Sequence, residues 1–121
     1  MNEVKYPLEE RTAKLGESVI ILCRDLKQDA ISRPLISQIV RSATSIGANY
    51  CEANGASSKL DFRNKIFICK KESQETKHWL RMLSTYYPND QEKMKLVWKE
   101  TQELTMIFQK ILNTISNSKR S

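Results

Sequence analysis

Apolar residues recur along this chain at alternating spacings of four and three, the rhythm of one buried helix face in a bundle. The first segment shows this rhythm at Leu15, Val19, Leu22 and Leu26, and Ile20 is expected to widen its stripe. Three later segments repeat the rhythm. Together they predict helices over about residues 8–27, 34–54, 58–85 and 90–116.

The three later stripes mix polar residues with apolar ones. The second consists of Leu35, Ile39, Ser42, Ile46, Asn49 and Ala53. The third consists of Phe62, Ile66, Cys69, Ser73, Thr76, Leu80 and Leu83. The fourth consists of Met94, Val97, Thr101, Leu104, Phe108, Ile111 and Ile115.

Residues that begin or end helices separate these stripes. Pro34 suits the first position of the second helix, with Ser32 or Arg33 as its cap. Asn54-Gly55 is typical of a helix end in the left-handed conformation. Ser58 followed by Asp61 resembles a capping box at the start of the third helix. Pro88 is expected to follow that helix's last residue.

These boundaries leave only short connections, and short connections place successive helices antiparallel to one another. No Pro-rich or Gly-rich linker divides the sequence. We therefore expect an all-α fold, a single domain over residues 1–121, built as an antiparallel up-down-up-down four-helix bundle.

Composition indicates a globular, basic chain. Apolar residues make up 40% and charged residues 28% of the sequence. No apolar run reaches the roughly 18 residues of a membrane span, and the N-terminus lacks the apolar core of a signal peptide. We therefore expect a cytoplasmic location and no membrane partner. The net charge of +6 permits attraction to nucleic acid or another polyanion.

Residues for metal binding or catalysis are sparse. Cys23, Cys51 and Cys69 include no Cys-x-x-Cys pair, so they are predicted to be buried, reduced thiols. Glu75 and His78 match the Glu-x-x-His motif of di-iron bundles, but such sites need two motifs and the chain has 1 histidine. A cysteine nucleophile would need the same histidine as its base. We predict no metal, no cofactor and no enzymatic activity.

Several polar residues lie in or beside the apolar stripes of the second and third helices. These are Arg41, Ser45, Asn49, Glu52, Glu72 and Glu75. Buried polar groups need partners, so the residues are predicted to form a buried polar network that fixes helix register. The alternative is a ligand or metal site.

Five cations follow one another along the third helix at spacings of 4, 7, 7 and 4. They are Lys59, Arg63, Lys70, Lys77 and Arg81. At about 100° per residue they fall within a narrow arc beside the apolar stripe. Such a row can follow a phosphate backbone; the alternative is a solvated face whose cations pair with neighbouring carboxylates. No alternation of aromatic and basic residues, as in proteins that stack single-stranded bases, is visible in the sequence.

Apolar residues outside the stripes indicate subunit contact. The candidates for an oligomer interface are Ile68, Trp79, Met82 and Trp98. They favour a homo-oligomer.

One family resemblance rests on residues of the second and third helices. The residues are Arg41, Ser42, Ser45, Ile46, Asn49 and Glu52, followed by Phe62, Lys70, Glu72, Glu75, Trp79 and Leu80. This pattern resembles the four-helix-bundle proteins encoded in intervening sequences of bacterial 23S rRNA genes. It is also similar, more distantly, to the accessory variability protein of diversity-generating retroelements.

The resemblance implies a ring-like homopentamer with a basic surface, a role in nucleic-acid binding, and no catalytic activity. The sequence therefore leads to the hypothesis of a non-enzymatic RNA- or DNA-binding oligomer. The alternative hypothesis is a protein-interaction scaffold that presents helix faces to a partner protein.

Overall fold

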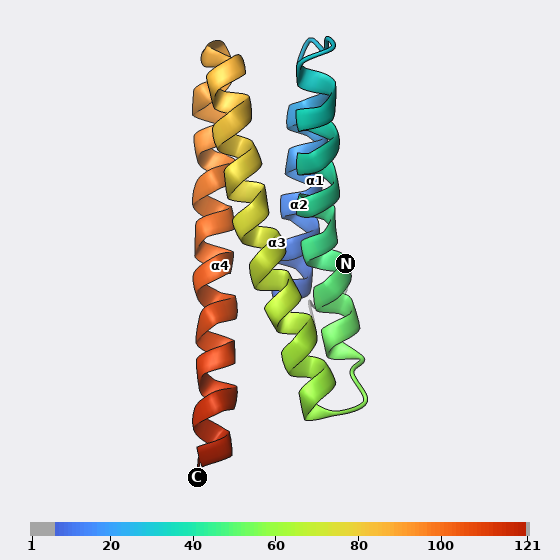
Figure 1. Ribbon diagram of the computed structural model, residues 1–121, viewed down its shortest axis with the longest axis vertical. Coiled ribbons are helices and arrows are strands. Elements are labelled where there is room, and N and C mark those ends of the chain that lie inside the picture. Colours follow the sequence, from blue (N-terminus) through green and yellow to red (C-terminus); the bar gives the residue numbers. More distant parts are fainter. Residues whose placement is uncertain (1–6, 121) are drawn as a thin grey trace.

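Four helices follow one another along the chain, joined by short turns (Figure 1). The computed structural model describes residues 7–120, with side chains through residue 117. The helices are α1 (Pro7–Arg24), α2 (Ser32–Asn54), α3 (Lys59–Tyr86) and α4 (Gln91–Arg120), and a 3-10 turn, η1 (Pro88–Asp90), precedes α4. No strand occurs in this described range. The predicted all-α antiparallel four-helix bundle is therefore confirmed.

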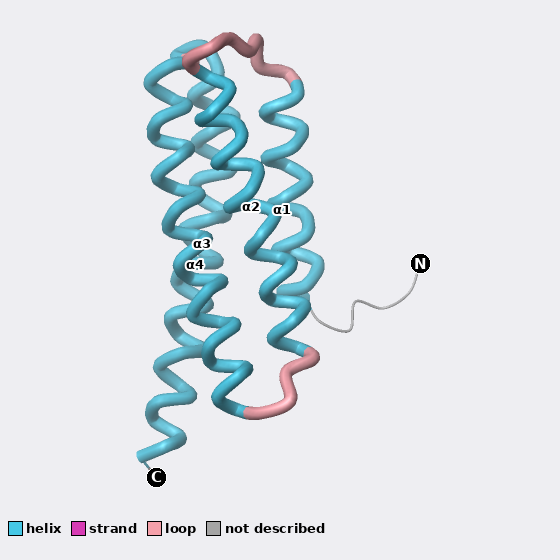
Figure 2. Tube along the Cα trace, turned by 45° about the vertical axis from the view of Figure 1, so that its right-hand side comes forward, coloured by secondary structure: helices cyan, strands magenta, loops and turns pink. Residues whose placement is uncertain are grey.

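The loops gather at the two ends of the bundle (Figure 2). Each helix packs against the next along the chain, and α4 closes the bundle against α1. The contact between α2 and α3 is the most extensive and that between α1 and α4 the least. The α1–α2 pair and the α3–α4 pair thus form opposite sides of the molecule (Figure 1).

The predicted stripes meet in the core. Val19, Ile39 and Ile66 have 0% exposed surface, one from each of the first three helices. Phe108 contributes the largest fully buried side chain from α4, and its ring centroid lies 6.2 Å from that of Tyr50. Burial of such side chains is the main source of stability in a bundle of this size.

Two predictions about the stripes need correction. Ile20 does not widen the buried face of α1, because its side chain is 48% exposed. Thr105 and Leu112, outside the predicted fourth stripe, are buried at 7% and 8% exposure. An α-helix drifts by about 20° per heptad against a strict seven-residue repeat, so the buried face of the long α4 shifts along its length.

The turn between α1 and α2 differs from the prediction. α1 ends at Arg24 and α2 begins at Ser32, where the sequence predicted residues 27 and 34. Asp29 caps α2, because its Oδ1 accepts the backbone N–H groups of Ile31 and Ser32, each at 2.9 Å. The Ser32 hydroxyl oxygen in turn accepts the Asp29 N–H at 2.9 Å. This reciprocal pair replaces the cap expected immediately before Pro34.

Two tyrosines near the end of α3 hold the same turn in place. The Tyr86 hydroxyl donates to Asp29 Oδ2, and the Tyr87 hydroxyl donates to the Lys27 carbonyl at 2.6 Å. The hydrogen bond with Tyr86 is the main cause that lowers the pKa of Asp29, and the same bond raises the pKa of Tyr86. The cap therefore depends on a residue far away in the sequence.

The turn between α2 and α3 confirms one prediction and corrects another. Ser58 caps α3 as expected, because its hydroxyl oxygen accepts the Asp61 N–H at 3.0 Å. α2 stops at Asn54, but Gly55 has φ −100° and is not left-handed. The N–H groups of Gly55 and Ala56 instead bond to the carbonyls of Glu52 and Ala53, each at 3.1 Å, which closes the helix with a tight turn.

Arg11 and Glu100 close the bundle between α1 and α4. The guanidinium forms two hydrogen bonds to the carboxylate, Nε to Oε2 at 3.1 Å and Nη2 to Oε1 at 2.7 Å. This pairing is the main cause that raises the pKa of Arg11. Glu103 adds a weaker ion pair at 3.4 Å.

We expect Arg11→Gln to lower the free energy of unfolding by about 1 kcal/mol, the upper end for a partly exposed pair, because the contact is bidentate. Urea unfolding followed by circular dichroism measures the change. The control is Lys14→Gln, whose exposed contact with Glu10 is 3.8 Å long and should contribute less than about 0.5 kcal/mol. Equal effects of the two variants would contradict a specific contribution of the Arg11 pair.

Candidate nucleic-acid interface

Positive charge is concentrated on one side of the bundle. α3 carries 7 Lys and Arg against 3 Asp and Glu, and α4 carries 6 against 3. α1, by contrast, has 3 of each kind. The charge excess of the chain therefore lies on the α3–α4 side, opposite the α1–α2 side.

The predicted cation row lies along the flank of α3 that faces α4. We define the row by its five residues, Lys59, Arg63, Lys70, Lys77 and Arg81. Its members are exposed or half-buried, and none forms an ion pair with a carboxylate of the described residues. In the described part of the chain, the row is therefore not neutralised by ion pairs with neighbouring carboxylates, which was the alternative interpretation.

The opposite flank of α3 behaves differently. Arg41 of α2 forms ion pairs there with Glu72 at 3.1 Å and Glu75 at 3.3 Å, and Lys65 of α3 pairs with Glu52 of α2 at 3.1 Å. The carboxylates of this region are thus engaged at the α2–α3 contact. The cation row on the other flank keeps its charge available for an external anion.

Side chains of α4 lie beside the row. Lys77 donates to Gln102 Oε1 at 2.5 Å, and its ammonium lies 5.7 Å from the centroid of the Trp98 ring. A hollow of about 470 Å³, which we call the α3–α4 groove, lies between the end of α3 and the start of α4, and Arg81, Lys95 and Trp98 belong to its lining. These α4 residues were not part of the predicted nucleic-acid site. Lys95, Trp98 and Gln102 are spaced by one and two helical turns on one face of α4, and this spacing is the only feature of the sequence that indicates they belong together.

Aromatic rings lie beside two cations of the row. Lys70 lies 6.0 Å from the centroid of the Phe67 ring, and Lys77 lies beside Trp98. Each of these two lysines therefore has an aromatic ring beside it. The pair with Trp98 is not visible in the sequence, because that ring comes from α4.

The predicted polar network is divided into three separate contacts. Asn49 Nδ2 donates to the Ser45 hydroxyl and the Ser45 carbonyl, both at 2.9 Å, while Arg41 and Glu52 make the ion pairs described above. The prediction that these residues are buried is wrong for Arg41 and Glu52, whose side chains are 50% and 60% exposed. Long side chains at the edge of a helix contact reach solvent with their charged ends.

The buried polar groups of the α2–α3 contact are hydroxyls instead. Ser42, Ser73 and Thr76 each have 0% exposed surface. The hydroxyls of Thr76 and Ser42 lie 2.9 Å apart across the two helices, and Ser73 donates to the Cys69 carbonyl at 2.8 Å. Glu72 lies at the edge of this cluster, where burial is the main cause that raises its pKa.

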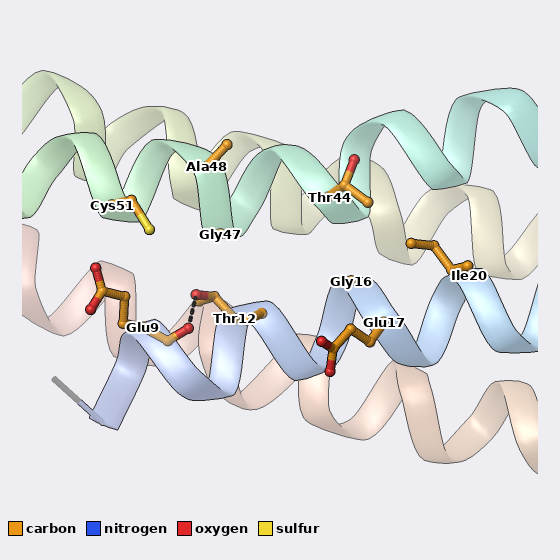
Figure 3. A pocket seen from close by; sticks show the side chains of 10 residues that line it. Glu9, Thr12, Gly16, Glu17, Ile20, Thr44, Gly47, Ala48 and Cys51 are labelled. Carbon is orange, nitrogen blue, oxygen red and sulfur yellow. Dashed lines mark hydrogen bonds between the residues drawn. The ribbon is translucent and has the colours of Figure 1, made fainter. Parts of the chain in front are cut away.

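A second groove, of about 270 Å³, lies between α1 and α2 (Figure 3). Small residues let these helices approach closely: a Cβ atom on Gly47 would lie 3.4 Å from the Thr12 carbonyl carbon. Glu9 and Glu17 carry the only charges among the lining residues, and both are negative. This groove therefore repels phosphate, in contrast to the α3–α4 groove.

The cysteines do not share one environment. Cys23 and Cys69 are buried as predicted, and burial raises the pKa of Cys23 to about 11 and that of Cys69 to about 12. The prediction is wrong for Cys51, which is exposed at the α1–α2 groove. Burial and the neighbouring Glu9 also raise the pKa of Cys51.

We expect one fast-reacting thiol per chain at about pH 8, because thiolate is the reactive form and less than about 0.1% of a buried thiol is ionised there. Titration with a chromogenic disulfide reagent measures the count. Cys51→Ser should remove the fast phase and leave only slow reaction limited by opening of the bundle. Three thiols reacting at one rate in the native protein would contradict this assignment.

Three of the residues predicted for subunit contact, Ile68, Trp79 and Met82, share one arc of α3, and the fourth, Trp98, lies on α4. Trp79 is half-buried and packs against the core, with its ring centroid 4.9 Å from that of His78. Ile68 precedes Lys77 by nine residues, about 180° around α3. It therefore lies on the side of α3 away from Trp98, which belongs to the α3–α4 groove. Met82 is half-buried.

Two further classes of site are not found in the described part of the chain. It contains no group of three or more His, Cys, Asp or Glu side chains placed to hold a metal ion. None of its helices is both long enough and apolar enough to cross a membrane.

Comparisons with known proteins give a family and a fold. Residues 7–113 match the model of a family described as 23S rRNA-intervening sequence protein. A similar solved structure is that of a protein with unknown function from the S23 ribosomal protein family of Bacteroides thetaiotaomicron, with 29% sequence identity and a TM-score of 0.77. The similarity covers 86% of this chain and 96% of that one. A search of curated proteins finds no match.

Proposed function

This chain belongs to the family of 23S rRNA-intervening sequence proteins, and from that premise we propose that it binds RNA without catalysis, through the cation row on α3. The observation that carries the proposal is the row itself, whose five members make no ion pair with a described carboxylate. The family gives the expected kind of nucleic acid, and the charge distribution gives the surface.

Geometry also supports contact with phosphates rather than with specific bases. Residues 59 to 81 of a straight helix span about 33 Å at 1.5 Å per residue. Lysine and arginine contacts to phosphate position a protein on nucleic acid without reading its sequence. The row therefore suits RNA binding with little sequence preference.

Salt dependence tests the proposal. If all five cations displace counterions, the logarithm of the binding constant should fall with the logarithm of salt concentration with a slope of about −3.5 for single strands and −4.5 for duplex. Between about 50 and 200 mM salt, affinity should fall on the order of 100-fold. Filter binding with fragments of 23S rRNA measures the slope. Absence of binding at low salt would overturn the proposal.

Our second proposal, that the chain forms a homo-oligomer, is supported by the α1–α4 face. Ile21 and Leu96 are 51% and 68% exposed there, beside shallow hollows that Ser18 and Val97 help to line. Exposed apolar groups of this kind support self-association of the chain into a homo-oligomer, with the pentamer of the family resemblance as the expected form.

Light scattering in the absence of RNA tests this second proposal. We expect a mass of five chains for the wild type and a smaller mass for a Leu96→Glu variant, because the charge would be buried in the contact. A single-chain mass for the wild type at micromolar concentration would contradict self-association. It would leave the RNA-binding proposal unaffected.

A further inference from the structure

Two exposed aromatic rings flank the cation row. The Phe67 side chain is 45% exposed and that of Trp98 is 41% exposed. All the other large apolar side chains exposed in the described chain are aliphatic: Ile20, Ile21, Ile31, Leu60, Leu96 and Met106. Both exposed rings thus lie beside cations of the row, which make no ion pair with a described carboxylate.

Each ring lies next to one cation of the row. The ammonium of Lys70 lies 6.0 Å from the Phe67 centroid, and that of Lys77 lies 5.7 Å from the Trp98 centroid. Lys70 and Lys77 are two helical turns apart, about 10 Å along the axis of α3. A strand whose phosphates follow these lysines would therefore pass both rings.

The hollow beside Trp98 has the size of a small-ligand site. Its volume of about 470 Å³ lies within the range of roughly 300–1,000 Å³ usual for such sites. Leu80 and Met94 give it apolar walls, and Gln91 and Glu92 contribute polar groups. Gln91 Nε2 already donates to the Ser84 carbonyl at 3.0 Å, which leaves its amide oxygen free to accept from a base.

We propose that the cation row and the adjoining α3–α4 groove bind single-stranded rather than base-paired RNA. One unpaired base stacks on Trp98 within the hollow, a second stacks on Phe67, and the intervening phosphates contact Lys70 and Lys77. The Glu92 carboxylate at the rim repels phosphate but accepts a hydrogen bond from the exocyclic amine of cytosine or adenine. This inference rests on the proposed RNA-binding function and specifies its substrate class.

The physical reason for selectivity is access to the faces of the bases. In duplex RNA the bases are stacked on one another, and a protein meets phosphates and 2′-hydroxyls. In a single strand the bases can leave the stack, and each base stacked on an aromatic side chain raises affinity on the order of 10-fold. Rings that are exposed beside a cation row therefore favour the unpaired form.

Fluorescence anisotropy with two labelled probes tests the inference: an unstructured RNA of 12 nucleotides, and the same strand annealed to its complement. We expect the single strand to bind on the order of 10-fold or more tightly than the duplex at about 100 mM salt. Trp98→Ala and Phe67→Ala should each weaken single-strand binding on the order of 10-fold and leave duplex binding unchanged. Trp98→Phe should retain most of the affinity.

The matched control is Ile20→Ala, which shortens an exposed apolar side chain of α1 at the α1–α2 groove and should change neither affinity. The dependence of the binding constant on salt concentration distinguishes stacking from charge. Loss of a ring should lower affinity without changing the slope of this dependence, whereas loss of a row cation should reduce the slope.

The possible results distinguish failure of this inference from failure of the proposed RNA-binding function. If the wild type binds single strand and duplex equally and both ring variants behave as wild type, the inference is overturned and RNA binding stands. If the wild type binds neither probe at low salt, the proposed function itself fails. Loss of single-strand affinity in both ring variants, with intact thermal unfolding, supports the inference.

Discussion

Reversing the charge of Lys70 and Lys77 together should weaken RNA binding on the order of 100-fold at low salt. Each substitution to Glu replaces an attraction to phosphate by a repulsion, and a tenfold loss for each corresponds to about 1.4 kcal/mol. Cations near a polyanionic surface contribute on this scale. The effect should be the same for RNAs of different sequence, because phosphate contacts do not read bases.

The control for this variant is a double reversal on the opposite side of the bundle, Arg24→Glu with Arg33→Glu. Both residues are exposed and belong to α1 and α2. The control changes net charge by the same amount, so it separates a specific surface from bulk attraction. Filter binding across a salt series should show a slope reduced by about 1.4 for Lys70 and Lys77, and little change for the control. Equal losses of RNA affinity in both variants would contradict the assignment of the cation row as the RNA-binding surface.

Phe108→Ala should lower the free energy of unfolding by about 3–5 kcal/mol, the largest stability effect of any single substitution considered for this bundle. The side chain has 0% exposed surface and is the largest of the fully buried ones. Its removal loses the transfer free energy of the ring and leaves a cavity beside Tyr50. Because domains of this size are stable by only about 5–15 kcal/mol, the variant should unfold at much lower urea concentration.

Met106→Ala is the matched control for the core variant. It removes an apolar side chain two residues earlier on the same helix, where the side chain is 62% exposed. Its effect should stay within about 0.5 kcal/mol. Both variants are measured at one chain concentration, because association would make stability depend on concentration. A loss below about 1 kcal/mol for Phe108→Ala would contradict the packing described for α4.

Local chemistry in the sequence was sufficient for most of the fold. The four-three spacing identified buried positions such as Ile39, Ile66 and Leu104, and Ser58 was recognised as a cap from its spacing to Asp61 alone. These features depend on residues within one or two turns of each other. The sequence misjudged the start of α2 because the Asp29 cap is held by Tyr86, 57 residues away.

The candidate site likewise has one part that local spacing predicts and another that depends on contacts between helices. The spacing of the five cations places them on one arc of α3, since position along a helix fixes the angle of each side chain about its axis. Which helix lies beside that arc depends on how the four helices pack. α4 brings Trp98 and Gln102 to the row, while the carboxylates of Glu72 and Glu75 face Arg41 on the other flank. Contacts between helices depend on which neighbour each face meets, and no periodicity within one segment contains that information.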